Sequence, residues 1–453
     1  MGVGLLVFFA ILILLFGVYK LLYSIKNANL FDVYVVFISL YFGLYTLIDL
    51  LAKNSNNFEP LSIISSMGSV IVILFILNVI LRVTKITSLS GLSVTNGIHY
   101  FEKLSLKFII IPTFVLFIKY YYATTLDFSD VIASSATDAA RPDLPYLYVI
   151  LSQFAKIAGC FVAFFSLAYI VRGKQFWQRV IGILALLLGI YSMFSDGRRA
   201  LFSFVVFAIY FLFLKITSDS RKRIKFLFLS FFIGAVFLLL SNVYQTYRML
   251  THAGVRVEEM SEKYGVQISE LSLLDLVDIS KTANTFSDRT SMWEFNYLTH
   301  RACIENGQCS FSNGELMIDV AMNWFPSIFF ENKLPIDGDG EVSRKFALEI
   351  KDWPTNIFNL LFADFGYLSL LIGPFFLLVI FFCLAKLITV SDSIFLRATA
   401  FSMVWNFTAQ IESGYMDWLG VLRNFTIIFI IYSIYTSVVG FIKYSLKPRI
   451  ESF

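Results

Sequence analysis

Stretches of about 20 consecutive apolar residues recur along nearly the whole chain, and they constrain its fold more than any other feature. Residues 3–22 and 226–243 are two examples. Such a stretch has the length that a helix needs to cross a hydrocarbon layer of roughly 30 Å. Of the 453 residues, 58% are hydrophobic and only 15% are charged, far from the composition of a soluble domain. The chain is therefore expected to be an integral membrane protein.

The apolar stretches are continuous rather than alternating, which excludes an outer-membrane barrel and predicts an all-α bundle. About eleven transmembrane helices are expected, at residues 2–24, 30–51, 61–82, 107–122, 146–171, 179–195, 200–215, 226–243, 357–387, 394–412 and 418–441.

Lysine and arginine gather at every second connection between these runs, for example at residues 215–225 and 443–449. Basic connections of membrane proteins stay on the cytoplasmic side. The alternate connections, such as 124–145, are poor in basic residues. This pattern predicts a multi-pass protein with its N-terminus outside and its C-terminus inside.

One connection is much longer than the others and divides the chain into three parts. Residues 244–355 form a polar, extracytoplasmic and partly helical segment that holds 17 of the 32 acidic residues. It separates an N-terminal bundle of about eight helices, residues 1–243, from about three helices and a short cytoplasmic tail in residues 356–453. Loops of this length usually carry function.

Two cysteines of the long segment, Cys303 and Cys309, are six residues apart. Outside the membrane they would meet oxidising conditions, which favours a disulfide over two free thiols. In neither state are they expected to be catalytic.

Several kinds of chemistry lack a motif in this sequence. There is no nucleotide-binding G-x-x-x-x-G-K-[ST] loop, no H-E-x-x-H metal motif and no G-x-S-x-G elbow. We therefore expect neither a metal nor a cofactor. The net charge of +4 is too small to indicate nucleic acid as a partner.

Arginines at the expected outer surface are the strongest candidates for a binding site. Arg198 and Arg199 lie in a tight connection, where they either bind an anion or pair with Asp196. Arg423 lies about one and a half turns inside the last apolar run. It is either a ligand for an anionic lipid head or the partner of Glu412 or Asp364.

The long segment supplies further candidates. One stretch that is expected to be helical contains Arg289, Trp293 and Glu294. These residues form either a site for a sugar and its phosphate or an amphipathic helix with a salt bridge. His300 is either a general base or a structural residue, and Arg301 follows it. Arg248 is either a phosphate ligand or an interfacial residue beside its tyrosines.

Three stretches resemble the Wzy-type O-antigen polymerases and, more broadly, the O-antigen ligase and polymerase superfamily. They are GRRA at residues 197–200, GELMIDVAMNWFPSIFFENKLP at 314–335 and NLLFADFGYLSLLIG at 359–373, followed by a late helix with Arg423. The large outer segment before the last helices is also similar.

The resemblance implies a GT-C-like membrane glycosyltransferase of the bacterial inner membrane with its active site facing the periplasm. Such an enzyme transfers a growing glycan from undecaprenyl pyrophosphate to a lipid-linked repeat unit. Its partners are the lipid-linked oligosaccharide, membrane lipid and a co-polymerase that regulates chain length.

In this reading, developing charge on the pyrophosphate is stabilised by arginines without a metal. The candidates are Arg198, Arg199, Arg289 and Arg423, with Arg248 and Arg301 as further ones. The base is Glu294 or Asp319, with His300 as the alternative. Trp293 and Trp324 are expected to stack on sugars.

Three other functions compete with this one, and one of them is a purely structural membrane subunit of a polysaccharide-export complex, which would not need the clustered outer arginines. An O-antigen ligase would move the finished glycan to a lipid A core and would use a loop histidine. A flippase or another transporter would also have many helices and intramembrane charges, but usually shows internal repeats.

Overall fold

The computed structural model describes residues 2–24, 29–53, 58–83, 92–125, 146–196, 198–216, 292–307, 309–324, 338–348, 356–409 and 414–445. Within these ranges about 90% of the residues are helical and no strand occurs. This agrees with the all-α architecture predicted from the apolar runs.

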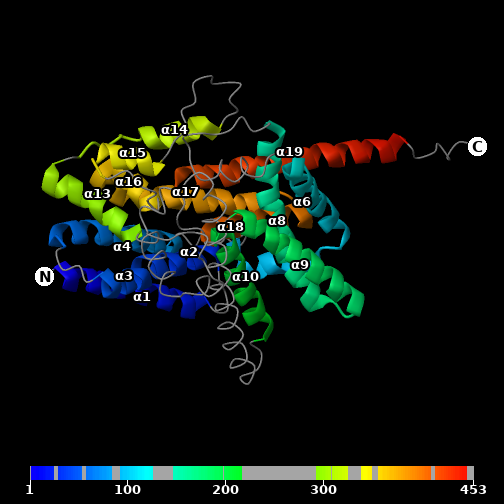
Figure 1. Ribbon diagram of the computed structural model, residues 1–453, viewed down its shortest axis with the longest axis horizontal. Helices are drawn as coiled ribbons and strands as arrows, with labels where there is room; N and C mark the ends of the chain where they lie inside the picture. Colours follow the sequence, from blue (N-terminus) through cyan, green and yellow to red (C-terminus); the bar gives the residue numbers. More distant parts are fainter. Residues whose placement is uncertain are drawn as a thin grey trace, which may run out of the picture.

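The helices follow one another along the chain and are shown in Figure 1. They are α1 (Gly2–Ser24), α2 (Leu30–Ser39), the π-helix η1 (Leu40–Leu44), α3 (Tyr45–Lys53), α4 (Pro60–Val83), α5 (Val94–Lys103), α6 (Lys107–Thr125), α8 (Tyr146–Arg172), α9 (Phe176–Asp196), α10 (Arg198–Ile216), α13 (Met292–Asn306), α14 (Glu315–Trp324), α15 (Gly338–Lys345), α16 (Ile357–Phe365), the 3-10 helix η6 (Gly366–Leu368), α17 (Ser369–Thr389), α18 (Ile394–Ala409) and α19 (Tyr415–Ser445).

Seven helical segments in the described part of the chain are long and apolar enough to cross a membrane. They are Gly2–Lys20, Leu30–Leu50, Pro60–Arg82, Phe154–Arg172, Phe176–Met193, Ile357–Thr389 and Trp418–Val439. Three more of the expected runs form the helices α6, α10 and α18. The run at 226–243 lies outside the described residues. The total of eleven spans and the GT-C-like arrangement therefore remain predictions.

The predicted helix at 357–387 is interrupted near its start. Gly366 ends α16 with a φ of +55°, which L side chains rarely adopt, and η6 then leads into α17. A Cβ atom at this position would lie 2.7 Å from the ring of Phe311. Both the backbone conformation and the close ring therefore require glycine here.

Aromatic rings form the centre of the bundle, where α5, α8, α10 and α18 meet. Phe164 and Phe207 stack with their centroids 3.8 Å apart, and Phe207 also contacts Trp405. The Trp405 indole donates a hydrogen bond to the Ser203 carbonyl at 2.9 Å. This bond gives the only polar atom of a buried indole a partner, as burial requires.

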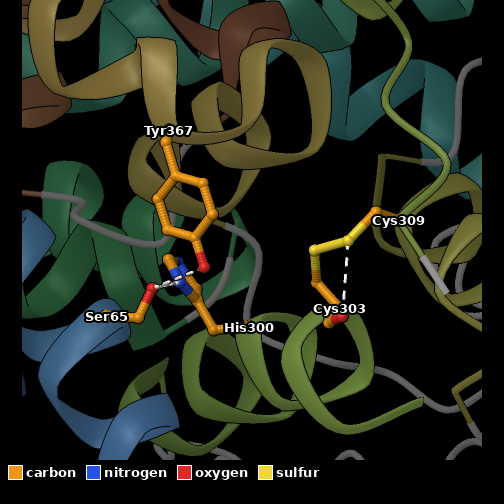
Figure 2. Close-up of a disulfide and its surroundings, with 5 residues drawn as sticks. All are labelled: Ser65, His300, Cys303, Cys309 and Tyr367. Atoms are coloured by element: carbon orange, nitrogen blue, oxygen red, sulfur yellow. Dashed lines mark hydrogen bonds between the residues drawn. A yellow bond between two sulfur atoms is a disulfide. The ribbon is translucent and has the colours of Figure 1, made fainter. Parts of the chain in front are cut away.

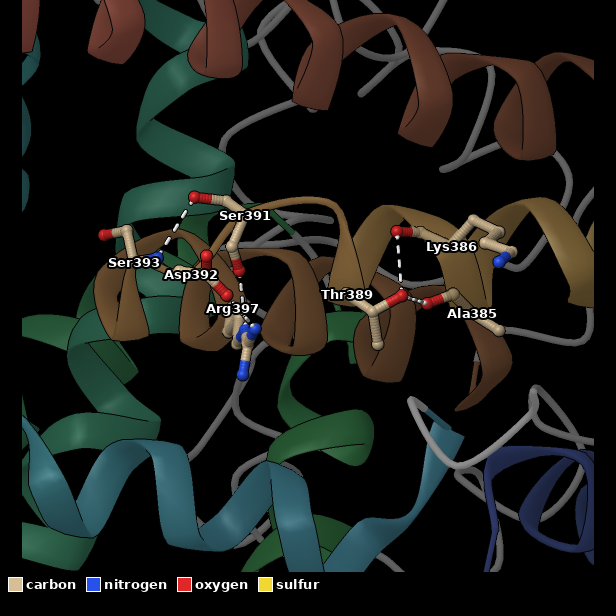
Figure 3. Close-up of polar contacts among 7 residues, drawn as sticks. All are labelled: Ala385, Lys386, Thr389, Ser391, Asp392, Ser393 and Arg397. Carbon is tan, nitrogen blue, oxygen red and sulfur yellow. Dashed lines mark hydrogen bonds and ion pairs between the residues drawn. The ribbon is translucent and has the colours of Figure 1, made fainter. Parts of the chain in front are cut away.

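The turn between α17 and α18 is held by polar contacts, drawn in Figure 3. Arg397 donates from Nε to the Ser391 carbonyl at 2.6 Å and pairs with Asp392 at 2.9 Å. Close by, the Ser393 hydroxyl donates to Tyr432 of α19 at 2.9 Å. These contacts fix the end of α17 that lies away from η6.

The helices of the long polar segment gather toward one end of the molecule. The N-terminus lies at the same end as α13 and α15, whereas the C-terminus lies at the opposite end (Figure 1). At the first end, α13 packs along α4, α15 along α16, and α14 against α19. The described part of the long polar segment is therefore folded onto the helices rather than extended away from them.

Phe362 of α16 joins these elements. Its ring stacks on His300 of α13 at 3.5 Å and contacts Phe311 at 5.6 Å, Phe346 just after α15 at 6.1 Å and Tyr367 of η6 at 5.6 Å. One buried side chain thus touches four parts of the polar end.

Replacing Phe362 by alanine should lower the stability by about 3–5 kcal/mol, because a fully buried ring is lost and a cavity remains. The measurement is thermal unfolding of the purified protein in detergent, followed by size-exclusion chromatography. Phe375→Ala is the matched control, since Phe375 of α17 is 53% exposed. Equal shifts in the two variants would contradict the central position of Phe362.

Candidate functional site

The contact between α13 and α4 begins at the start of α4. Glu59 precedes the first residue of this helix, Pro60, and its carboxylate accepts the N–H of Ser62 at 2.5 Å. Its own N–H donates to the Tyr297 hydroxyl of α13 at 2.9 Å. Although burial opposes ionisation of Glu59, hydrogen bonds from the Ser62 and Leu61 backbone outweigh it and lower the pKa. A charged residue thus caps α4 and ties it to α13.

Farther along α13, Trp293 and Asn296 also bond to the bundle. The Trp293 indole donates to Asp49 of α3 at 3.1 Å, and its ring contacts Phe58 and Tyr297. The Asn296 amide donates to the Ser66 carbonyl at 3.0 Å. Trp293, which the sequence suggested for sugar stacking, is only 2% exposed. Its ring packs α13 onto the bundle instead of lining an open surface.

His300 lies one turn beyond Asn296 and is 1% exposed. Its Nδ1 atom is 2.7 Å from the Ser65 hydroxyl of α4, while Nε2 is buried without a hydrogen-bond partner (Figure 2). Burial lowers the pKa of the imidazole to about 3, so the side chain is neutral at pH 7. A buried imidazole with so low a pKa is a weak base, which favours the structural alternative for His300.

Arg301 follows His300 but points to the surface. It pairs with Glu305, one turn further on, at 2.6 Å, and this hydrogen bond raises the pKa of the guanidinium. Cys303 and Cys309 are joined by a disulfide that closes the end of α13 (Figure 2). The polar end of α13 is therefore held by a covalent bond as well as by its contacts with α4.

The N-terminus of α14 is capped from a distant helix. Both carboxylate oxygens of Asp364, in α16, accept backbone N–H groups, from Leu316 and Met317, each at 3.1 Å. Asp364 is fully buried, so these bonds satisfy a charge that would otherwise be costly. This role differs from the ion pair with Arg423 that the sequence left open.

The candidate base Asp319 is exposed on α14, and the candidate base Glu294 is half-buried on α13. Arg423 is half-buried in α19, the helix against which α14 packs, and its Nε donates to Asn424 at 3.3 Å. Of the proposed residues, the described packing therefore brings the helices of Asp319 and Arg423 together.

The remaining candidates are less fully described. Arg198 and Arg199 open α10 and Trp324 ends α14, but their side chains are outside the described set. Arg248 and Arg289 lie outside the described residues.

Three features of this arrangement were not predicted from the sequence: the contacts of Ser65, those of Tyr367 and the capping role of Asp364. A signal existed for the first, since Ser62, Ser65, Ser66 and Ser69 recur at helical spacing within an apolar run. Such a polar stripe indicates a contact with protein rather than lipid. The partner helix could not be identified from the pattern.

Compared with protein-family models, curated proteins and solved structures, the chain has no match.

The stability of α13 should depend on pH through His300. An unfolded histidine has its ordinary pKa of 6.5, whereas the buried one has a pKa of about 3. Below pH 6.5 the unfolded form binds a proton that the folded form does not. The free energy of unfolding is therefore unaffected by this histidine above pH 6.5. Below pH 6.5 it falls by up to about 1.4 kcal/mol per pH unit.

Hydrogen exchange of the α13 amides at pH 7.5 and 5.0, corrected for intrinsic rates, measures this loss. His300→Asn should remove most of it, while His99→Gln should keep it, because the His99 side chain is 55% exposed. An unchanged pH dependence in His300→Asn would refute the assignment.

Asp364→Ala should destabilise α14 by about 2 kcal/mol, because it removes two charge-assisted bonds to a helix N-terminus. Limited proteolysis between α14 and α15 reports the opening. Asp392→Ala, at an exposed carboxylate, should leave the cleavage rate unchanged. Equal rates in both variants would speak against the cap.

Proposed function

We propose that this protein is a membrane glycosyltransferase that polymerises lipid-linked oligosaccharide repeat units at the outer face of a bacterial inner membrane. The observation that carries the proposal is the packing of α14 against α19. It brings a helix with an exposed carboxylate, Asp319, next to a helix with a half-buried arginine, Arg423. A base and an anion ligand at a membrane surface are what transfer from a lipid pyrophosphate needs.

The proposed reaction forms one bond and breaks one. A hydroxyl oxygen of the acceptor sugar attacks the anomeric carbon of the donor glycan, and the bond from that carbon to the pyrophosphate oxygen breaks. The pyrophosphate leaves with the electron pair, and the hydroxyl proton goes to the base. The products are free undecaprenyl pyrophosphate and a glycan longer by one repeat unit, which stays linked to the acceptor's own lipid carrier.

Exposure supports Asp319 as the base rather than the buried His300 or the half-buried Glu294. For the leaving group, Arg423 is supported by its position in an apolar span, where an unpaired charge is costly and an anion would offset the cost. Arg198 and Arg199 are the first residues of α10. The N-terminus of a helix carries partial positive charge, so it attracts anions and repels basic side chains that have no anion beside them. The two arginines are therefore further ligands in this proposal, and Arg301 at the surface of α13 is a weaker one.

The arrangement of the ends supports the proposed orientation. Because the N-terminus and α13 lie at one end and the C-terminus at the other (Figure 1), an outer N-terminus puts the polar segment in the periplasm and the tail in the cytoplasm. The disulfide is also consistent with an oxidising compartment.

The test is reconstitution of the full chain in liposomes with a polyprenyl-pyrophosphate-linked repeat unit from the source organism, without nucleotide or added metal. A ladder of glycans on a gel is the expected result. Arg423→Ala should reduce polymer formation by at least about 100-fold, as the loss of a charge-stabilising donor does in other enzymes. Asp319→Asn should have a comparable effect.

Arg397→Ala is the matched control, because this arginine is bonded within the turn between α17 and α18 and should not affect the reaction. Wild-type polymer from Arg423→Ala would remove Arg423 from the site. With folded wild-type protein, transfer only after addition of lipid A core would indicate a ligase, and movement of the unit across the bilayer without new bonds would indicate a transporter.

A further inference from the structure

A second polar site lies at the junction of α4, α13 and η6. The Ser65 hydroxyl is 2.7 Å from His300 Nδ1 and 3.4 Å from the Tyr367 hydroxyl (Figure 2). Ser65 is half-buried and Tyr367 is 52% exposed, so the rest of the protein does not cover this junction. No residue of this junction except His300 was among the candidates from the sequence.

The aromatic rings around the junction hold it in one geometry. His300 stacks on Phe362 with an angle of 18° between the rings, and Phe362 meets the Tyr367 ring edge-on at 78°. Gly366, in a conformation that favours glycine, directs the chain into η6 just before Tyr367. Phe362 and the backbone at Gly366 therefore hold the Tyr367 side chain in place, while about half of its surface stays exposed. A side chain that is already ordered loses less entropy when it binds a ligand.

Hydrogen-bonding capacity remains at Ser65. A hydroxyl group has one donor and two acceptor positions. One contact goes to His300 and one to Tyr367, which leaves one for a ligand. Because Nε2 of His300 is buried and the imidazole is neutral, the histidine acts on a ligand only through Ser65.

The chemistry of the junction suits a sugar better than a phosphate. Its polar groups are two hydroxyls and a neutral imidazole, and the neighbouring side chains of Ile64 and Leu368 are exposed and apolar. A sugar ring combines hydroxyls with apolar C–H faces that pack on an aromatic ring. A phosphate would call for cationic side chains.

We infer that Tyr367 and Ser65 bind a sugar of the lipid-linked repeat unit, with Tyr367 packing on the ring and Ser65 bonded to a hydroxyl. His300 is a positioning residue that orients the Ser65 hydroxyl. The inference rests on the proposed function for the identity of its ligand. Tyr367, rather than the buried Trp293, is then the aromatic ring on which the sugar packs.

The test uses the full-length protein and two readouts. The first is equilibrium binding of the free oligosaccharide repeat unit, released from its lipid, to the protein in detergent. The second is the KM for the lipid-linked unit in the polymerisation assay. Ser65→Ala and Tyr367→Ala should each weaken binding and raise KM by about five- to tenfold, as expected for the loss of one contact, with kcat within about twofold.

A matched pair of control variants lies at the other end of α17. Ser393 and Tyr432 form a serine–tyrosine hydrogen bond of 2.9 Å, and the 21 residues of α17 place it about 30 Å away. Ser393→Ala and Tyr432→Phe should leave binding and KM unchanged. Ser65→Thr should restore binding, because it keeps the hydroxyl.

The role of His300 is tested by a double-mutant cycle. If it acts through Ser65, His300→Asn should weaken binding in the wild type but add nothing in Ser65→Ala. Additive losses would overturn the positioning role, and chromatography on a sizing column identifies variants that fail to fold.

The outcomes separate the two proposals. A wild-type ladder with unchanged binding and KM in Ser65→Ala and Tyr367→Ala would overturn the sugar site and leave the polymerase standing. Binding of the oligosaccharide that depends on Ser65 and Tyr367, without a ladder, would support the sugar site and overturn the polymerase. Wild-type protein that does not bind the oligosaccharide would overturn the sugar site.

Discussion

The stacking of His300 on Phe362 is the contact on which the polar end of this protein depends. Burial beside a phenylalanine favours the neutral imidazole, and Ser65 of α4 provides a hydrogen-bond partner for one of its two nitrogens. Phe362 in turn contacts Phe346, just after α15, and Tyr367 of η6. This single stack therefore connects a spanning helix, the long polar segment and the start of α17. Through this contact, the described part of the long polar segment packs on the end of the apolar bundle.

The architecture could be predicted because its physical cause is local. A helix in a hydrocarbon layer must satisfy its own backbone, so each apolar run specifies its own structure. The disulfide partners could be named for a similar reason, since Cys303 and Cys309 lie close in sequence. The break at Gly366 was hidden, because the apolar run continues through it and the glycine is required by a ring 55 positions earlier, Phe311.

The site was harder to predict because its contacts join residues far apart in the chain. Trp293 was expected to stack on a sugar because it lies with Arg289 and Glu294 on one stretch, yet Asp49, 244 positions away, accepts its indole N–H in the interior. His300 and Ser65 are 235 positions apart. A pattern within one segment indicates that a polar residue needs a partner, but it does not identify the helix that supplies it.

The long separation between α4 and α13 has a consequence for how the protein is made. Translation at about 5–20 residues per second takes roughly 10–50 s to cover 235 residues. During that time the serine stripe of α4 exists, but α13, whose Asn296 and His300 contact it, has not yet been made. The polar end can therefore assemble only after the helices from α1 to α10 have been synthesised.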